Sequence, residues 1–172
     1  QLGKVDACFA NAGIGRMANF IDMQLSTWRE VTRVNLDGAF LTLREAARHM
    51  VARGEGGSLV ATASVAAIHG AARMEPYAAS KAGVVAMMRG LAVELARERV
   101  RCNSILPGWV ETDMTAMSRS YKKFVDNTTN RTPIRRWGVP EDIGPVAVFL
   151  AQPGLMFHTG DTIVVDGGYT AF

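Results

Sequence analysis

Residues 58–81 read SLVATASVAAIHGAARMEPYAASK and contain a complete step from a strand to a helix. The apolar run at 58–63 has the length of a buried strand. After a loop, Pro76 precedes an Ala- and Met-rich segment that predicts a long helix over 77–97, because a helix does not extend backwards through proline. A short apolar strand that leads into a long helix is the repeating unit of parallel sheets, so this stretch favours an α/β architecture.

The alternation of strands and helices continues on both sides of this stretch. Upstream, an apolar run at 5–10 predicts a strand, and Thr27 and Glu30 have the spacing of a capping box for a helix that ends at Arg53. Such an alternation implies right-handed crossovers and a parallel sheet with helices on both faces. Downstream, we expect strands at 100–106 and 162–165, a helix at 140–151 and a mobile helical flap within 113–136.

Composition excludes several classes of protein. The chain has 172 residues, of which 48% are hydrophobic and 20% charged, as in one ordinary globular domain covering 1–172. Its net charge of +3 is dispersed, which argues against nucleic-acid binding, and its apolar runs are too short for a membrane span. Cys8 and Cys102 lie in apolar runs, which predicts buried free thiols, a cytoplasmic location and no metal site.

The pair Tyr77 and Lys81 carries the strongest chemical signal. Residues four apart on a helix stand one above the other, so the Lys81 ammonium is expected near the Tyr77 phenol. A nearby cation favours the phenolate and should lower the pKa of Tyr77 toward the range useful for acid–base catalysis. A surface pair on an amphipathic helix is the alternative, since Tyr and Lys often occur at this spacing.

Ser64 and Asn35 are further candidates. Ser64 follows the strand at 58–63, where its hydroxyl can hold a carbonyl oxygen or simply cap a turn. Asn35 lies in the middle of a predicted helix, where asparagine is unfavourable, and its apolar neighbours indicate partial burial. A solvent-facing Asn35 is the simpler alternative.

These residues and several turns together resemble the short-chain dehydrogenase/reductase family, in order and over nearly the whole chain. The similarity is to members of the 3-oxoacyl-carrier-protein reductase type. It implies a Rossmann-like doubly wound parallel sheet, of which this chain is the C-terminal part, and an enzyme that interconverts an alcohol and a ketone or aldehyde with NAD or NADP. The motifs are Asn11-Ala12-Gly13, Asn35, Ser64, Tyr77, Lys81, Pro107-Gly108, Thr112 and the closing stretch at 159–168.

The resemblance also implies a role for each residue. Tyr77 is the acid–base and Ser64 orients the substrate oxygen. Lys81 lowers the pKa of Tyr77 and binds the nicotinamide ribose, and Asn35 holds a water that connects Lys81 to solvent. The residues expected to contact the cofactor are Asn11, Ala12, Gly13, Tyr77, Lys81, Pro107, Gly108, Val110 and Thr112. The residues expected to contact the carbonyl or alcohol substrate are Ser64, Tyr77, His69, Met74 and Trp109, with ordinary loop packing as the alternative for His69 and Met74.

One part of the family pattern is missing. No glycine-rich turn of the kind that holds a pyrophosphate is present, and we expect about 60–80 residues, or two βαβ units, before Gln1. Without them the strand at 5–10 would have a bare edge, so we expect a longer polypeptide or pairing with another copy. The residue that selects NAD or NADP is absent with them, and this fragment alone is expected to be inactive. By resemblance, the enzyme is a homo-oligomer, a dimer or tetramer, that pairs through its two long helices.

Two other functions fit parts of the pattern. The halohydrin dehalogenases resemble this family and work without a dinucleotide, but they replace the lysine by arginine, so Lys81 argues against a dehalogenase or lyase. A non-catalytic scaffold is the second alternative, and the intact set of four residues argues against it. The flap contains cations that favour either an acidic substrate or a solvated charged face: Arg119, Lys122, Lys123, Arg131, Arg135 and Arg136.

Overall fold

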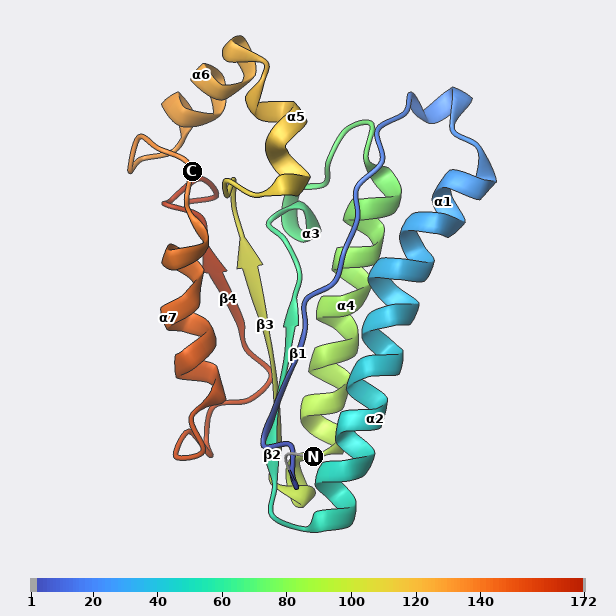
Figure 1. Cartoon of the computed structure of the whole chain (residues 1–172), viewed down its shortest axis with the longest axis vertical. Helices are drawn as coiled ribbons and strands as arrows, with labels where there is room; N and C mark the ends of the chain where they lie inside the picture. The colour runs from blue at the N-terminus through green and yellow to red at the C-terminus, as the bar shows by residue number, and fades with distance from the viewer. Residues whose placement is uncertain (1–2, 172) are drawn as a thin grey trace.

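The computed structural model describes residues 3–171, and its strands form one parallel sheet in the order β1-β2-β3-β4. Figure 1 shows this sheet as the middle layer of the molecule. The predicted four-stranded parallel sheet is confirmed, and β4 has the bounds expected from the sequence. The strands are β1 (Ala7–Ala10), β2 (Gly57–Thr62), β3 (Val100–Pro107) and β4 (Thr162–Val165).

Helices cover both faces of the sheet. In Figure 1, α2 (Gly38–Arg53) and α4 (Glu75–Glu94) lie on one face, and α7 (Pro140–Ala151) lies on the other. Successive side chains of β2 point to opposite faces, so Leu59 joins the core under α2 and α4 while Val60 joins the core under α7. Burial on both sides explains the apolar run at 59–61 within β2.

The first long helix differs from the prediction at its start and in its middle. It begins at α1 (Leu25–Thr32) with Gln24 as its N-cap, so Thr27 lies inside the first turn and the predicted capping box is wrong. It then passes through a π-helical turn, η2 (Arg33–Asp37), before it continues as α2. A π-turn contains one residue more than an α-turn, and this extra residue is not visible in the spacing of apolar positions.

The second long helix also begins earlier than predicted. The helix α4 starts at Glu75, so Pro76 lies inside its first turn. Proline is tolerated in this turn because the first backbone N–H groups of a helix have no partner within the helix. The helix ends at Glu94 and is followed by the 3₁₀ turn η3 (Ala96–Glu98), so the predicted end at Arg97 is wrong by one short turn.

The remaining elements lie mainly at one end of the sheet. Within the described residues, β1 pairs only with β2 and has a free outer edge. No helix in the described part of the chain is both long and apolar enough to cross a membrane. The flap is helical as expected. The short elements are η1 (Phe20–Asp22), α3 (Ala66–His69), η4 (Asp113–Thr115), α5 (Ala116–Arg119) and α6 (Lys122–Arg131).

Candidate active site

Ser64 lies just beyond the carboxyl end of β2, where backbone hydrogen bonds fix the chain. The amide of Ala63 donates to the Ile105 carbonyl at 2.8 Å, and the amide of Val65 donates to the Pro107 carbonyl at 3.1 Å. The Ser64 hydroxyl oxygen accepts a hydrogen bond from the Ala66 amide at 3.1 Å, which starts α3. Ser64 therefore lies in a defined place, half-buried at the end of the sheet.

Lys81 is buried beside Tyr77, one turn further along α4. Only 3% of Lys81 is exposed, and its Nζ lies 5.7 Å from the centre of the Tyr77 ring. Nζ donates a 2.7 Å hydrogen bond to the carbonyl of Thr62, the last residue of β2. Burial lowers the pKa of Lys81 to about 8. The helical spacing therefore brings the two side chains together, and the surface-pair alternative is wrong for Lys81.

The predicted lowering of the Tyr77 pKa is wrong for this chain. Burial raises the pKa of Tyr77, and a side-chain hydrogen bond with Ser64 lowers it by less. The phenolate is a charged form that loses hydration in the interior, and this cost exceeds the effect of the Ser64 hydrogen bond. Tyr77 therefore carries its proton at neutral pH, close to Ser64 and Lys81.

Asn35 lies in the π-turn and is buried, with only 1% of its surface exposed. Its Oδ1 accepts a 2.8 Å hydrogen bond from the Ile14 amide, and its Nδ2 donates to the Ile14 carbonyl at 3.0 Å. These two bonds clamp the turn that follows β1. The solvent-facing alternative for Asn35 is wrong.

The predicted glycine of that turn lies against the lysine. A Cβ on Gly13 would come within 3.2 Å of Lys81 Nζ and 3.5 Å of Asn35 Oδ1. Asn11 and Ala12 lie before it, exposed, on the rim of a cavity of about 100 Å³ between β1 and α2. The structure thus places Gly13 against Lys81 and Asn35, and it leaves Asn11 and Ala12 at the surface.

The predicted residues that follow β3 lie at the same edge of the sheet. The Gly108 amide donates to the Val165 carbonyl at 3.0 Å, and a Cβ on Gly108 would approach the Cβ of Asp166 to 2.6 Å. Val110 is buried, and Thr112 caps η4. The Pro107-Gly108 turn is thus held against the end of β4.

The other three residues expected to contact the substrate, besides Ser64 and Tyr77, lie in different surroundings. Met74 extends toward Gly15, since its Cε would be 2.6 Å from a Cβ there. His69 is exposed, with its ring 6.0 Å from that of Tyr169. Trp109 packs on Trp137, with ring centres 5.3 Å apart, and against the edge of Phe124. Trp109 therefore belongs to an aromatic cluster next to the flap. It also lines a cavity of about 210 Å³, as does Ile143 of α7.

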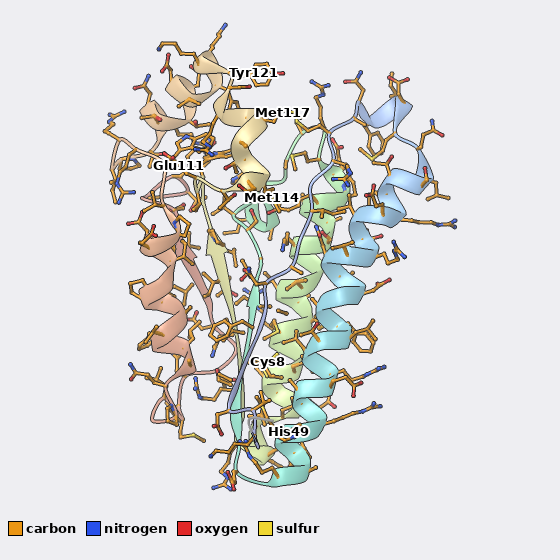
Figure 2. The ribbon with its side chains drawn as sticks, in the orientation of Figure 1. Cys8, His49, Glu111, Met114, Met117 and Tyr121 are labelled. Carbon is orange, nitrogen blue, oxygen red and sulfur yellow. The ribbon has the colours of Figure 1, made fainter. Side chains whose placement is uncertain are left out.

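Most flap cations are engaged by neighbouring groups. Figure 2 labels Met114, Met117 and Tyr121 of the flap, and Glu111 just before it, at one end of the molecule. Because these cations already have partners, they favour the solvated charged face over an assembled site for an acidic substrate. Arg119 pairs with Glu111, Lys122 with Asp126 and Arg136 with Asp142, while Arg131 stacks on Tyr169 and Arg135 donates to the Asn130 carbonyl.

Sequence reasoning missed Ser80. This serine is buried between Tyr77 and Lys81, and it contacts Asn35. Its only signal in the sequence is a hydroxyl inside an Ala-rich helix, one residue before the lysine, where serine is mildly unfavourable.

The chain thus has a buried lysine, a tyrosine, a serine and an asparagine near the carboxyl edge of a parallel sheet, and known proteins share its sequence and fold. Residues 1–170 match a family model described as "Enoyl-(Acyl carrier protein) reductase". L-rhamnose 1-dehydrogenase (NAD(P)(+)) from Sphingomonas sp. (strain SKA58) is 38% identical over 166 residues, which are 96% of this chain and 65% of that protein. The 3-oxoacyl-[acyl-carrier-protein] reductase of Chlamydia pneumoniae is 38% identical over 97% of this chain and 66% of its own length.

A solved structure gives the same relationship. The gluconate 5-dehydrogenase from Burkholderia cenocepacia J2315, in complex with NADP and tartrate, superimposes with a TM-score of 0.96 at 35% identity, and the alignment covers 100% of this chain and 67% of that one. The chain belongs to the short-chain dehydrogenase/reductase family. It spans about two thirds of the length of the relatives that it matches.

Proposed function

We propose that this chain supplies the catalytic part of an NAD(P)-dependent oxidoreductase that interconverts an alcohol and a ketone or aldehyde. The observation that carries the proposal is the buried Lys81 ammonium, which lies 5.7 Å from the Tyr77 ring. Ser64 is hydrogen-bonded to Tyr77, and Asn35 lies with Lys81 beside Gly13. Among residues 3–171 no carboxylate pairs with Lys81, and a buried charge of this kind is costly unless it has a use.

The residues fit a dinucleotide. Within the described residues, Lys81 Nζ makes one hydrogen bond, to Thr62, although an ammonium has three donors, so it can also bind ribose hydroxyls. Gly13 leaves open the space in front of Nζ that a side chain would fill. When bound, the nicotinamide supplies or accepts the hydride. Two of the proteins named above, the L-rhamnose 1-dehydrogenase and the gluconate 5-dehydrogenase, carry NAD(P)(+) or NADP in their descriptions, which supports either cofactor for this chain.

The chain's own residues move the proton. In the direction of carbonyl reduction, the Tyr77 hydroxyl donates its proton to the substrate oxygen, and the Ser64 hydroxyl donates a hydrogen bond to the same oxygen. The raised pKa of Tyr77 keeps this proton in place until the oxygen becomes basic. The Lys81 ammonium then stabilises the phenolate that remains. Asn35 holds the turn that carries Gly13 against Lys81.

The test uses the product of the complete gene and, in parallel, the 172-residue chain. NADH and NADPH are titrated by nicotinamide fluorescence, and turnover is followed with small ketones and sugar acids. We expect the complete product to bind and turn over, and Tyr77→Phe to abolish turnover while dinucleotide binding is retained. If neither the complete gene product nor the 172-residue chain binds NADH or NADPH, the assignment as an oxidoreductase is refuted.

The substrate and assembly belong to the same proposal. The sugar and acyl relatives support a small-molecule carbonyl or alcohol as the substrate, without deciding which. We propose a cytoplasmic homo-oligomer, a dimer or tetramer, which size-exclusion chromatography with light scattering tests directly.

A further inference from the structure

Ser80 forms a buried bridge between two parts of the candidate site. Its hydroxyl donates a 2.7 Å hydrogen bond to the Tyr77 carbonyl, and its oxygen accepts a 3.1 Å hydrogen bond from Asn35 Nδ2. Only 1% of Ser80 is exposed. The bridge therefore joins the first turn of α4 to the π-turn of the neighbouring helix without bulk solvent.

The direction of these bonds is fixed by chemistry. A carbonyl oxygen only accepts, so the single Ser80 proton goes to Tyr77 and only lone pairs remain toward Asn35. Asn35 must then present its NH₂ group to Ser80 and its oxygen to the Ile14 amide. The same orientation satisfies the Ile14 carbonyl, which accepts the second Nδ2 proton. Three hydrogen bonds therefore determine one orientation of the amide.

This orientation decides what faces the lysine. Asn35 Oδ1 and Lys81 Nζ lie within 3.5 Å of the same point, the place that a Cβ would take on Gly13. With the amide reversed, a donor NH₂ group would face the ammonium. Ser80 thus supports an oxygen on the lysine side and keeps Gly13 beside Nζ.

We propose that Ser80 is a positioning residue of the active site. It acts through Asn35 and Tyr77, and it holds the Tyr77 turn, the π-turn and the turn at Gly13 in one arrangement around Lys81. The proposal rests on the proposed oxidoreductase function. Without the hydroxyl, one proton of the Asn35 amide loses its partner in the interior, which loosens the connection between the Tyr77 turn and the π-turn.

The experiment compares three variants of the complete gene product. Ser80→Ala removes the bridge, and Ser80→Thr keeps a hydroxyl that can bond the carbonyl one turn back. Ser58→Ala is the matched control, because Ser58 is equally buried, at the start of β2, and donates a 2.8 Å hydrogen bond to the Leu150 carbonyl. Melting temperature, the Kd of NADPH, kcat and substrate KM are measured for each variant.

We expect both alanine variants to lower the melting temperature, and only Ser80→Ala to lower kcat, by about fivefold to thirtyfold. The substrate KM should change little, since Ser64 and the flap are untouched, and Ser80→Thr should recover most of kcat. A Ser80→Ala variant that matches Ser58→Ala in kcat and NADPH affinity, or a threonine variant as slow as the alanine, overturns the positioning role. Failure of the proposed function looks different, because the wild-type enzyme would then show no turnover.

Discussion

Replacement of Lys81 by methionine should stabilise the fold while it removes activity. The pKa of Lys81 falls from 10.5 in the unfolded chain to about 8 in the folded chain because of burial. The difference of about 2.5 pH units corresponds to about 3 kcal/mol of free energy against the charged lysine in the folded state at pH 7. Methionine fills a similar volume without a charge, although the Thr62 carbonyl loses its partner and offsets part of the gain.

The sign of the pH dependence follows from the same shift. Between pH 8 and 10.5 the unfolded chain binds the Lys81 proton more tightly than the folded chain, so the wild type gains stability as the pH rises through this range. Without the Thr62 offset, the advantage of Lys81→Met is about 3 kcal/mol at pH 7 and about half of that at pH 9.5. The loss of the Thr62 hydrogen bond reduces the advantage equally at both pH values, so the decrease between pH 7 and 9.5 stays the same.

Urea unfolding of both proteins at pH 7 and 9.5 measures these differences. Lys123→Met is the control, because Lys123 is exposed on α6 and its replacement should change the unfolding free energy by less than about 0.5 kcal/mol. If the stability advantage of Lys81→Met does not change with pH, or if the methionine variant is less stable than the wild type at pH 7, the charged Lys81 does not destabilise the fold and the reasoning is refuted.

Two further predictions concern the turn after β3 and the proton donor. Gly108→Ala should lower the unfolding free energy by about 2 kcal/mol, because the new Cβ would lie 2.6 Å from the Asp166 Cβ and 2.8 Å from its backbone Cα. Differential scanning calorimetry tests it against Gly144→Ala, where no atom lies within 4 Å and no loss is expected. Alcohol oxidation by the complete gene product should rise with pH through the alkaline range, because it needs the phenolate of Tyr77 and burial raises the pKa of this phenol. A plateau already at pH 8 in kcat/KM would show instead that Tyr77 ionises early.

The inner strand β2 could be predicted from the sequence because it is buried on both faces. Such a strand is a short apolar run between turn residues, and the partly exposed run at 162–165 also has the same bounds in the structure. Helix starts were less predictable. The apparent capping box at Thr27 and the expected start at Tyr77 were wrong, since neither a Thr–Glu spacing nor a proline determines which turn of a helix comes first.

The proximity of Tyr77 and Lys81 could be predicted from the sequence, and the electrostatics of the candidate site could not. Helical spacing was enough to bring Tyr77 beside Lys81. The direction of the Tyr77 pKa depends on how deeply the phenol is buried, and burial depends on loops whose course the sequence does not reveal. Ser80 was missed for a similar reason. A serine inside a helix becomes informative only when the π-turn brings Asn35 within hydrogen-bond distance.

The same three features that reduce the stability of this region also make it suitable for proton transfer. A π-turn, a buried amide and a buried ammonium each cost free energy that an apolar helix packed on the sheet would not. Their effects are coupled, because the π-turn places Asn35, Asn35 clamps Ile14, and the adjoining Gly13 lies against Lys81. A ligand that offers hydroxyl acceptors to Lys81 would recover part of the lost hydration of the ammonium. Dinucleotide binding should therefore raise the pKa of Lys81 and bring more of its positive charge to Tyr77 at the pH of turnover.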